Sequence, residues 1–125
     1  MTQPKELRLV EEDGVQVVEG KPGEPLMESV DDAGRVIEAC FTHRVDAALL
    51  YPENLTATFF DLSSGQAGAI LQKLRNYRVR LAVVCPPSGV QLSSRFGEMV
   101  AEEQKGRYFG LFETRRAARE WLGQP

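Results

Sequence analysis

Two serines and a glycine, Ser63-Ser64-Gly65, stand directly before a segment with the apolar spacing of an amphipathic helix. The first backbone N–H groups of a helix lack internal partners and carry a positive partial charge, so such a turn can bind phosphate or carboxylate. The same residues fit a capping box, because Ser63 and Gln66 have the S-x-x-Q spacing in which each side chain binds a free backbone donor. Helix caps are much commoner than anion sites, which makes the cap the simpler interpretation.

Other polar residues are expected where the predicted parallel strands end. Ligands of open parallel sheets bind beyond the carboxyl ends of the strands. The loop after the predicted strand at 46–51 is longer than usual connections, so we expect it to pack its own aromatic pair, Phe59-Phe60. A solvated rim is the default for polar loop residues. Together with Gly65, the rim is also our candidate site for a ligand or a partner, and it consists of Glu53, Asn54, Asp61, Ser63, Ser64 and Ser88.

Residues suited to catalysis or metal binding are scarce. His43 is the only histidine, and its expected position at a helix C-terminus, where the strands begin, keeps it far from the rim. Cys40 and Cys85 lie in separate apolar runs without CxxC spacing, which indicates buried thiols in a reducing compartment. Phosphate-loop, dinucleotide-binding, zinc-protease and calcium-loop motifs are absent from the sequence. We therefore expect no catalytic residue, metal or cofactor, although an enzyme using Glu53 or Cys85 stays open.

The composition is that of one globular domain covering residues 1–125, with 42% hydrophobic and 26% charged residues. A net charge of −3 argues against DNA or RNA as a partner. The first residues do not form a signal peptide, and no segment reaches the length of a membrane span, so we expect a cytoplasmic protein. The basic residues are interpreted as a solvated face, and they are Arg75, Arg78, Arg80, Lys105, Arg107, Arg115, Arg116 and Arg119.

Short β-favouring segments at 5–10 and 15–19 predict an antiparallel hairpin, since Asp13-Gly14 suits a tight turn with positive φ. Apolar runs at 46–51 and 79–85, each stopped by proline, predict strands buried on both faces. A last strand is expected at 107–112.

Apolar residues at helical spacing predict helices between and after these strands. The first stripe is Ala33, Val36, Ile37, Cys40 and Phe41, and the second is Ala67, Ile70, Leu71, Leu74 and Tyr77. A third helix carries Phe96, Met99 and Val100 and ends at Gly106, and a fourth covers 116–122. The prediction is an α/β fold of order ββαβαβαβα: a two-layer α/β sandwich whose N-terminal hairpin joins a mainly parallel sheet with helices packed against it.

The stretches FFDLSSGQAGAILQKLRNYRVRLAVV, SSRFGEMVAEEQKGRYF and FETRRAAREWL resemble a bacterial family known as domain of unknown function 4180. Its marks are an ENL loop, a Phe-Phe-Asp-Leu step into a glycine-containing helix, a strand of the RLAVV kind and a late Ala…Trp-Leu ending. Here they correspond to residues 53–55, 59–62, 65–74, 80–84 and 118–122. The resemblance implies the architecture and not a mechanism, because the activity of that family is not established.

More distantly, the element order and the serine turn look like the sulfate transporter and anti-sigma antagonist (STAS) domain. That resemblance implies a STAS-like α/β fold that binds proteins or ligands without catalysis. In STAS sporulation regulators a DSSG turn carries a phosphorylated serine, which corresponds to Ser63. In the present sequence, Leu62 separates Asp61 from the two serines.

Three functions remain open from the sequence. The first is a non-enzymatic regulatory or binding module that uses residues 53–65 to hold a protein partner or a small anionic ligand. The second is a switch protein phosphorylated at Ser63 or Ser64, and the third is a small-molecule enzyme with its site at the strand carboxyl ends. The open edge of the hairpin also allows a homodimer.

Overall fold

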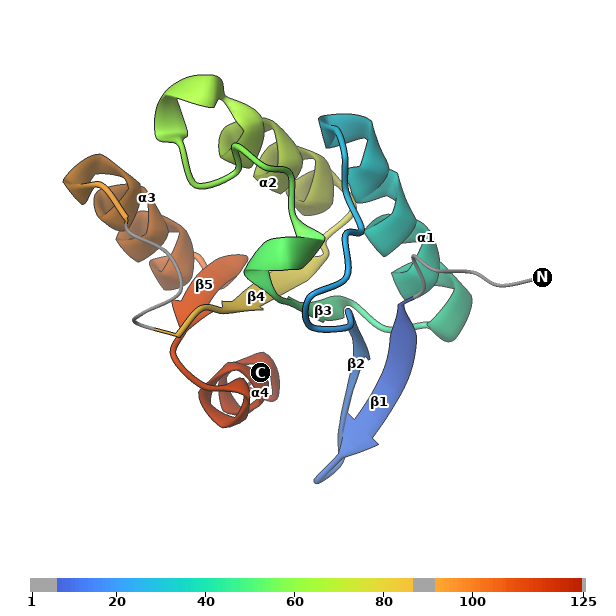
Figure 1. The fold of residues 1–125 in the computed structure, drawn as a ribbon. Helices are drawn as coiled ribbons and strands as arrows, with labels where there is room; N and C mark the ends of the chain where they lie inside the picture. Colours follow the sequence, from blue (N-terminus) through green and yellow to red (C-terminus); the bar gives the residue numbers. More distant parts are fainter. Residues whose placement is uncertain (1–6, 87–91, 125) are drawn as a thin grey trace.

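In the part of the chain that the structure describes, five strands form one mixed sheet in the order β1-β2-β3-β4-β5. The computed structural model describes residues 7–86 and 92–124 (Figure 1). The first two strands form the predicted antiparallel hairpin, and each later strand runs parallel to its predecessor. The turn of the hairpin has positive φ at both Asp13 (52°) and Gly14 (77°), as the sequence predicted. The strands are β1 (Arg8–Glu12), β2 (Val15–Glu19), β3 (Ala47–Leu50), β4 (Arg80–Val84) and β5 (Phe109–Phe112).

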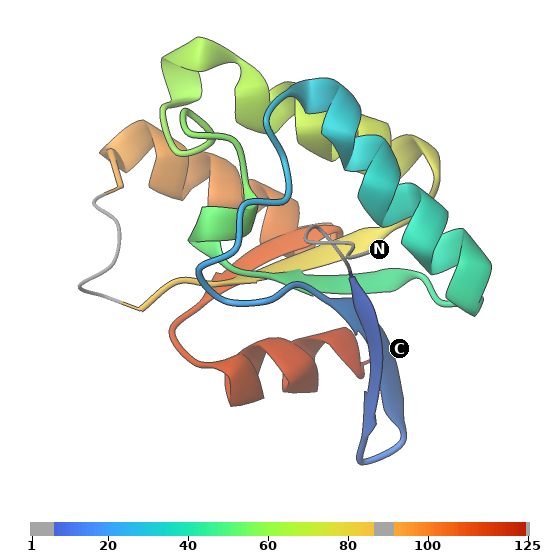
Figure 2. The same cartoon turned by 45° about the vertical axis from the view of Figure 1, so that its right-hand side comes forward.

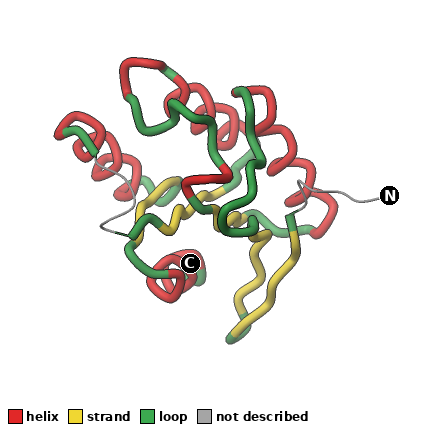
Figure 3. The backbone as a smooth tube through the Cα atoms, viewed as in Figure 1, coloured by secondary structure: helices red, strands yellow, loops and turns green. Residues whose placement is uncertain are grey.

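Among the described residues, three α-helices cover one face of the sheet, and a fourth covers the other face (Figure 2). The first group comprises α1 (Ala33–His43), α2 (Gln66–Asn76) and α3 (Ser94–Lys105), each of which joins two parallel strands. The last helix, α4 (Arg115–Leu122), follows β5 and packs against the opposite face. The α/β class and the order ββαβαβαβα are therefore confirmed, and the long loops that follow β2 and β3 lie side by side (Figure 3).

The sheet separates two apolar cores, which explains the uninterrupted apolar runs of its central strands. In β3, Ala48 and Leu50 belong to the core under α1, α2 and α3, while Ala47 and Leu49 belong to the core under α4. All four residues are buried, because successive side chains of a strand point to opposite faces and both faces are covered.

An aromatic cluster fills the larger core beside α3. Phe59 is fully buried, and its ring makes edge contacts with Phe60, Phe96 and Phe109 at centroid distances of 5.1, 6.1 and 6.0 Å. The long loop after β3 thus packs its own aromatic pair, as predicted from its length. These contacts fix the loop against the sheet.

Two aromatic residues assigned to the helical stripes do not enter the core. Phe41 is 85% exposed and Tyr77 is 64% exposed. Phe41 follows the buried Cys40 by one residue, which turns it about 100° away from the core-facing direction of α1. Tyr77 comes after the last residue of α2, where the chain leaves helical geometry. The prediction that Phe41 and Tyr77 belong to the buried stripes was therefore wrong, and each of them stands at the end of its stripe.

Replacing Phe59 with alanine should lower the free energy of unfolding by about 3–5 kcal/mol, because it leaves a cavity at the centre of the aromatic cluster. The same change at the exposed Phe41 should alter stability by less than about 0.5 kcal/mol. Urea denaturation followed by circular dichroism measures both. Equal effects at the two positions would contradict the assignment of Phe59 to the core.

Candidate functional site

The loop before α1 is fastened to the loop after β3 by the side chain of Asn54. Its side-chain amide is buried, and Asn54 is only 1% exposed. The Nδ2 group donates to the carbonyl oxygens of Lys21 and Glu24 at 2.9 and 2.6 Å, and Oδ1 accepts from the backbone N–H of Tyr51 at 2.8 Å. All the hydrogen-bonding groups of this amide are therefore used inside the protein.

Gly20 makes room for the Asn54 amide at the end of β2. A Cβ atom at Gly20 would stand 2.4 Å from Asn54 Oδ1 and 3.0 Å from Leu50 Cδ2, so a larger residue would displace the amide. The N–H of Gly20 donates to the carbonyl of Leu49 at 3.0 Å, and the N–H of Met27 donates to the carbonyl of Asn54 at 2.9 Å. The two loops consequently lie side by side in a fixed arrangement (Figures 1 and 2).

The serine turn is built differently from the predicted capping box. A 3-10 turn ends at Ser64, and α2 begins at Gln66 after Gly65, whose φ is +77°. Asp61 caps the 3-10 turn, since its Oδ1 accepts from the N–H of Ser63 at 3.1 Å and from its hydroxyl at 2.6 Å. Ser64 Oγ accepts from the N–H of Gln66 at 3.1 Å. The prediction that Ser63 caps α2 was wrong, because the left-handed residue Gly65 separates the two helical segments.

The hydroxyl of Ser64 also ties the serine turn to the preceding loop. Its oxygen lies 2.9 Å from the carbonyl oxygen of Thr58 and 2.7 Å from that of Asp61. The N–H of Ser63 already donates to the carboxylate of Asp61. This carboxylate also brings a negative charge to the turn that we considered as an anion site, which disfavours an anion there. Both serines are exposed, but their hydroxyls already serve the conformation of the loop.

An open groove of about 640 Å³ lies between the two loops at the carboxyl end of β3. Its walls are mostly apolar and carry two glutamates. The hydroxyl of Thr56 is buried in the wall without a hydrogen-bond partner among the described residues. The lining residues are Pro25, Met27, Glu28, Pro52, Glu53, Leu55, Thr56, Ala57 and Phe60.

The structure brings only part of the predicted rim to this groove. Glu53 lines it and accepts from the N–H of Gly23 at 3.2 Å. Asn54 lies inside the protein, whereas Asp61 and the two serines form their own turn, and Ser88 lies outside the described residues. The thiol of Cys85 has a raised pKa, caused by burial and then by the charge of Glu53, so the thiolate needed for nucleophilic catalysis is disfavoured.

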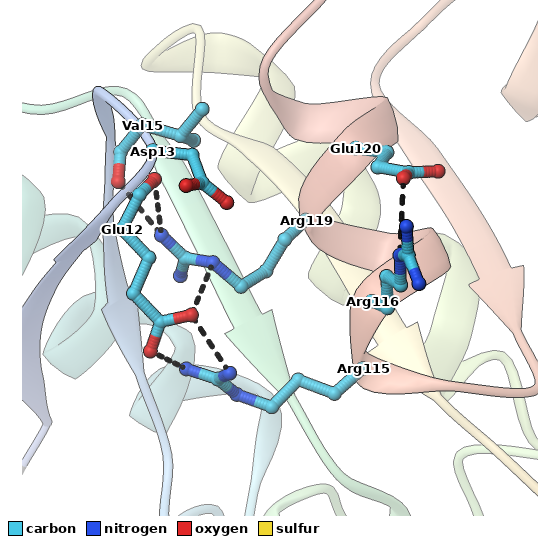
Figure 4. Close-up of a pocket in the computed structure, with 7 residues that line it drawn as sticks. All are labelled: Glu12, Asp13, Val15, Arg115, Arg116, Arg119 and Glu120. Atoms are coloured by element: carbon cyan, nitrogen blue, oxygen red, sulfur yellow. Dashed lines mark hydrogen bonds and ion pairs between the residues drawn. The ribbon is translucent and has the colours of Figure 1, made fainter.

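A second hollow, of about 440 Å³, contains a cluster of charged side chains between α4 and the hairpin (Figure 4). Arg115 donates to both oxygens of Glu12 at 3.0 and 2.9 Å and to both oxygens of Glu19 at 2.8 and 3.0 Å. Arg119 is only 7% exposed and donates to the carbonyl of Val15 at 2.7 Å. By contrast, Arg116 points away from the hairpin toward Glu120 (Figure 4).

These ion pairs shift the titration of the groups involved. The pKa of Arg115 is raised by its hydrogen bonds to Glu19 and Glu12. The pKa of Glu12 is lowered mainly by its hydrogen bond from Arg115. Burial, together with the neighbouring Glu19, raises the pKa of Tyr51, whose hydroxyl lies 3.3 Å from Glu19 Oε2. Two guanidinium groups face two carboxylates, so the cluster neutralises itself and holds α4 to the hairpin.

The interpretation of the arginines as a solvated face was wrong for several of them. Arg115 and Arg119 are four residues apart and share the face of α4 that meets the hairpin, a spacing that the sequence already contained. Arg80 donates to the carbonyls of Trp121 and Leu122 at 3.1 and 3.0 Å, and its guanidinium lies 4.8 Å from the ring centroid of Trp121. Their partners lie far away in the sequence, which hid these roles.

Groups typical of metal or redox sites are not assembled in the described part of the chain. No cluster of three or more His, Cys, Asp or Glu side chains there has the geometry to hold a metal ion. Cys40 and Cys85 are free and buried, and desolvation raises the pKa of Cys40 to about 12. His43 ends α1, as predicted. Among the described residues, no helix is long and apolar enough to cross a membrane.

Replacing Asn54 with alanine should lower the free energy of unfolding by about 3 kcal/mol, because the N–H of Tyr51 and the carbonyl of Glu24 lose the side-chain partner that this buried amide provides. Asn76 offers a matched control, since it is exposed and its side chain bonds only to Gln72 among the contacts described. Alanine at Asn76 should cost less than about 0.5 kcal/mol. Chemical denaturation of both variants makes the comparison, and a small effect at Asn54 would show that the amide does not hold the loops.

Acid should weaken the α4 cluster in a way that depends on Arg115. Because the pKa of Glu12 is lower in the folded protein than its usual 4.5, its stabilising contribution is present at neutral pH and is lost as the pH falls through the folded pKa. Unfolding measured between about pH 6 and pH 3 should therefore show a smaller loss of stability with acid in Arg115→Gln than in the wild type. Arg116→Gln is the control, and an Arg115→Gln profile as steep as that of the wild type would contradict the assignment.

Comparison with known families gives one clear relationship. A family model described as Domain of unknown function (DUF4180) matches residues 12–122, from the last residue of β1 to the last residue of α4. A comparison with curated proteins and one with solved structures each found no match. Because the matched region covers nearly the whole chain, the protein belongs to the DUF4180 family.

Proposed function

We propose that this protein is a non-enzymatic binding module whose groove holds a short segment of a partner protein. The segment carries apolar side chains and at least one lysine or arginine. The observation that supports this function is the lining of the groove, which combines apolar walls with the carboxylate of Glu53 and contains no basic residue among those described.

The apolar part of the lining supports a hydrophobic contact. Pro25, Pro52 and Ala57 present small or rigid surfaces, while Met27 supplies a side chain that adapts to different partners. Leu55 and Phe60 also belong to the lining and add apolar surface.

Charge favours a basic partner over the anionic ligand. Opposite charges at the rim of a contact steer association and suppress wrong partners. Glu53 lies in the groove wall, and in the serine turn the N–H of Ser63 donates to the carboxylate of Asp61. An anion would meet these charges, whereas a lysine or arginine would complement them.

The fixed geometry of the loops also supports binding. The side chain of Asn54 holds one wall of the groove to the other, and Ser64 ties the serine turn to Thr58. A groove whose walls are already ordered loses little conformational entropy when a partner enters.

The wider proposal is that the protein is a cytoplasmic regulator related to STAS domains. The order ββαβαβαβα and the position of the serine turn before α2 support that relationship. Regulation would then consist of binding a segment of the partner in the groove, without any chemical step.

Selection from a displayed library of random peptides tests this function. Bound peptides should be rich in apolar residues and contain lysine or arginine. Ala57→Trp, which fills the groove from an exposed position, and Glu53→Lys, which reverses its charge, should each weaken a selected peptide by about tenfold or more in fluorescence anisotropy.

Glu98→Lys is the matched control, because Glu98 is exposed on α3 and lies outside the groove lining. It makes the same change of net charge and should alter the affinity by less than about twofold. Peptides without basic residues, or peptides that bind equally well to Ala57→Trp and Glu53→Lys, would refute the assignment of the groove.

A further inference from the structure

We propose that the free edge of β1 pairs with β1 of a second copy of this chain. The two strands run antiparallel with Val10 opposite Val10 of the second copy, so that the two sheets become continuous. This surface is separate from the groove, and its partner is specified by the charges of the strand itself.

The edge is open in the described part of the chain. β1 stands at the end of the strand order and pairs only with β2. Glu12 and Val15 flank a two-residue turn and therefore form a hydrogen-bonded pair, which makes Val10 the next residue to bond to β2. The backbone N–H and C=O groups of Leu9 and Glu11 must then point outward, toward the free edge.

The charge sequence of β1 selects one register. With Val10 on the two-fold axis, Arg8 lies opposite Glu12 of the second copy, and the outward-facing Leu9 and Glu11 form hydrogen-bonded pairs across the interface. A register centred on Glu11 would oppose two carboxylates, and one centred on Leu9 would oppose Arg8 to Val10. Only the Val10 register pairs all five residues of the strand and places Arg8 opposite a carboxylate.

The surroundings of β1 suit this pairing. Only the last two residues of β2, Val18 and Glu19, pair with β3, so the turn half of the hairpin extends beyond the rest of the sheet (Figure 2). Arg8 is exposed, and Leu9 is 39% exposed. Arg115 holds Glu12 in place, and a carboxylate has acceptor capacity for a further guanidinium.

Charged residues on an edge strand usually prevent association. In β1, Arg8 stands at one end and Glu12 at the other end. These charges disfavour most partners, but they complement an antiparallel copy of the same strand, in which Glu12 lies opposite Arg8. Such an arrangement provides specificity for one partner and one register.

Sedimentation equilibrium of the full chain at about 100 µM should show a dimer, and Arg8→Glu should raise its dissociation constant by about tenfold or more. Arg8→Ala should have a smaller effect, since it removes the attraction without adding repulsion. Circular dichroism checks that both variants fold. A monomeric wild type, or an unchanged dimer in Arg8→Glu, would overturn the proposal.

Oxidative cross-linking tests the register independently of Arg8. Val10→Cys brings two thiols face to face on the two-fold axis, within the distance that a disulfide spans, whereas Leu9→Cys faces Glu11 of the second copy. The native Cys40 and Cys85 are buried. Cross-linked dimer should form about tenfold faster with Val10→Cys than with Leu9→Cys. Equal rates, or faster reaction of Leu9→Cys, would exclude the Val10 register.

Discussion

The loops at the carboxyl ends of β2 and β3 depend on one buried primary amide. Asn54 offers two donors and one acceptor, and each meets a backbone group of one of the two loops. Neither loop belongs to a strand of the sheet, so the hydrogen bonds of this side chain hold the two loops together. Gly20 is part of the same constraint, because only a residue without a Cβ leaves space for the amide. The walls of the groove are consequences of that arrangement.

Much of the fold was predictable because its signals are local. Four consecutive apolar residues in β3 indicate a strand buried on both faces, and Asp13-Gly14 indicates a two-residue hairpin. The role of Asn54 was not predictable in the same way, since its partners Lys21 and Glu24 lie 33 and 30 residues upstream. The prediction that Ser63 caps α2 failed for a different reason. Ser63 and Gln66 have the spacing of a capping box, but Ser63 lies in a short 3-10 turn that the left-handed Gly65 separates from α2.

Charged side chains are arranged differently in the α4 cluster and in the groove. On the side of α4, carboxylates and guanidinium groups pair with one another, and Arg119 is buried within that balance. At the groove, the described lining contains the carboxylate of Glu53 and no basic residue. Membership of the DUF4180 family does not decide between these regions, so their physical difference is the reason to look for a partner at the groove. At α4 the opposite charges balance within the chain, although Nη1 of Arg119 has no hydrogen-bond partner among the described residues.

The attachment of α4 has a consequence for biosynthesis. Its hydrogen bonds to the hairpin join residues 103 and 96 positions apart, from Arg115 back to Glu12 and Glu19. During synthesis from the N-terminus, the hairpin and the parallel strands are complete before this helix exists, and the face containing Val17 and Leu49 stays uncovered until then. Glu12 and Glu19 make that face partly polar before α4 covers it. This apolar face of the nascent chain is therefore open to aggregation until α4 emerges.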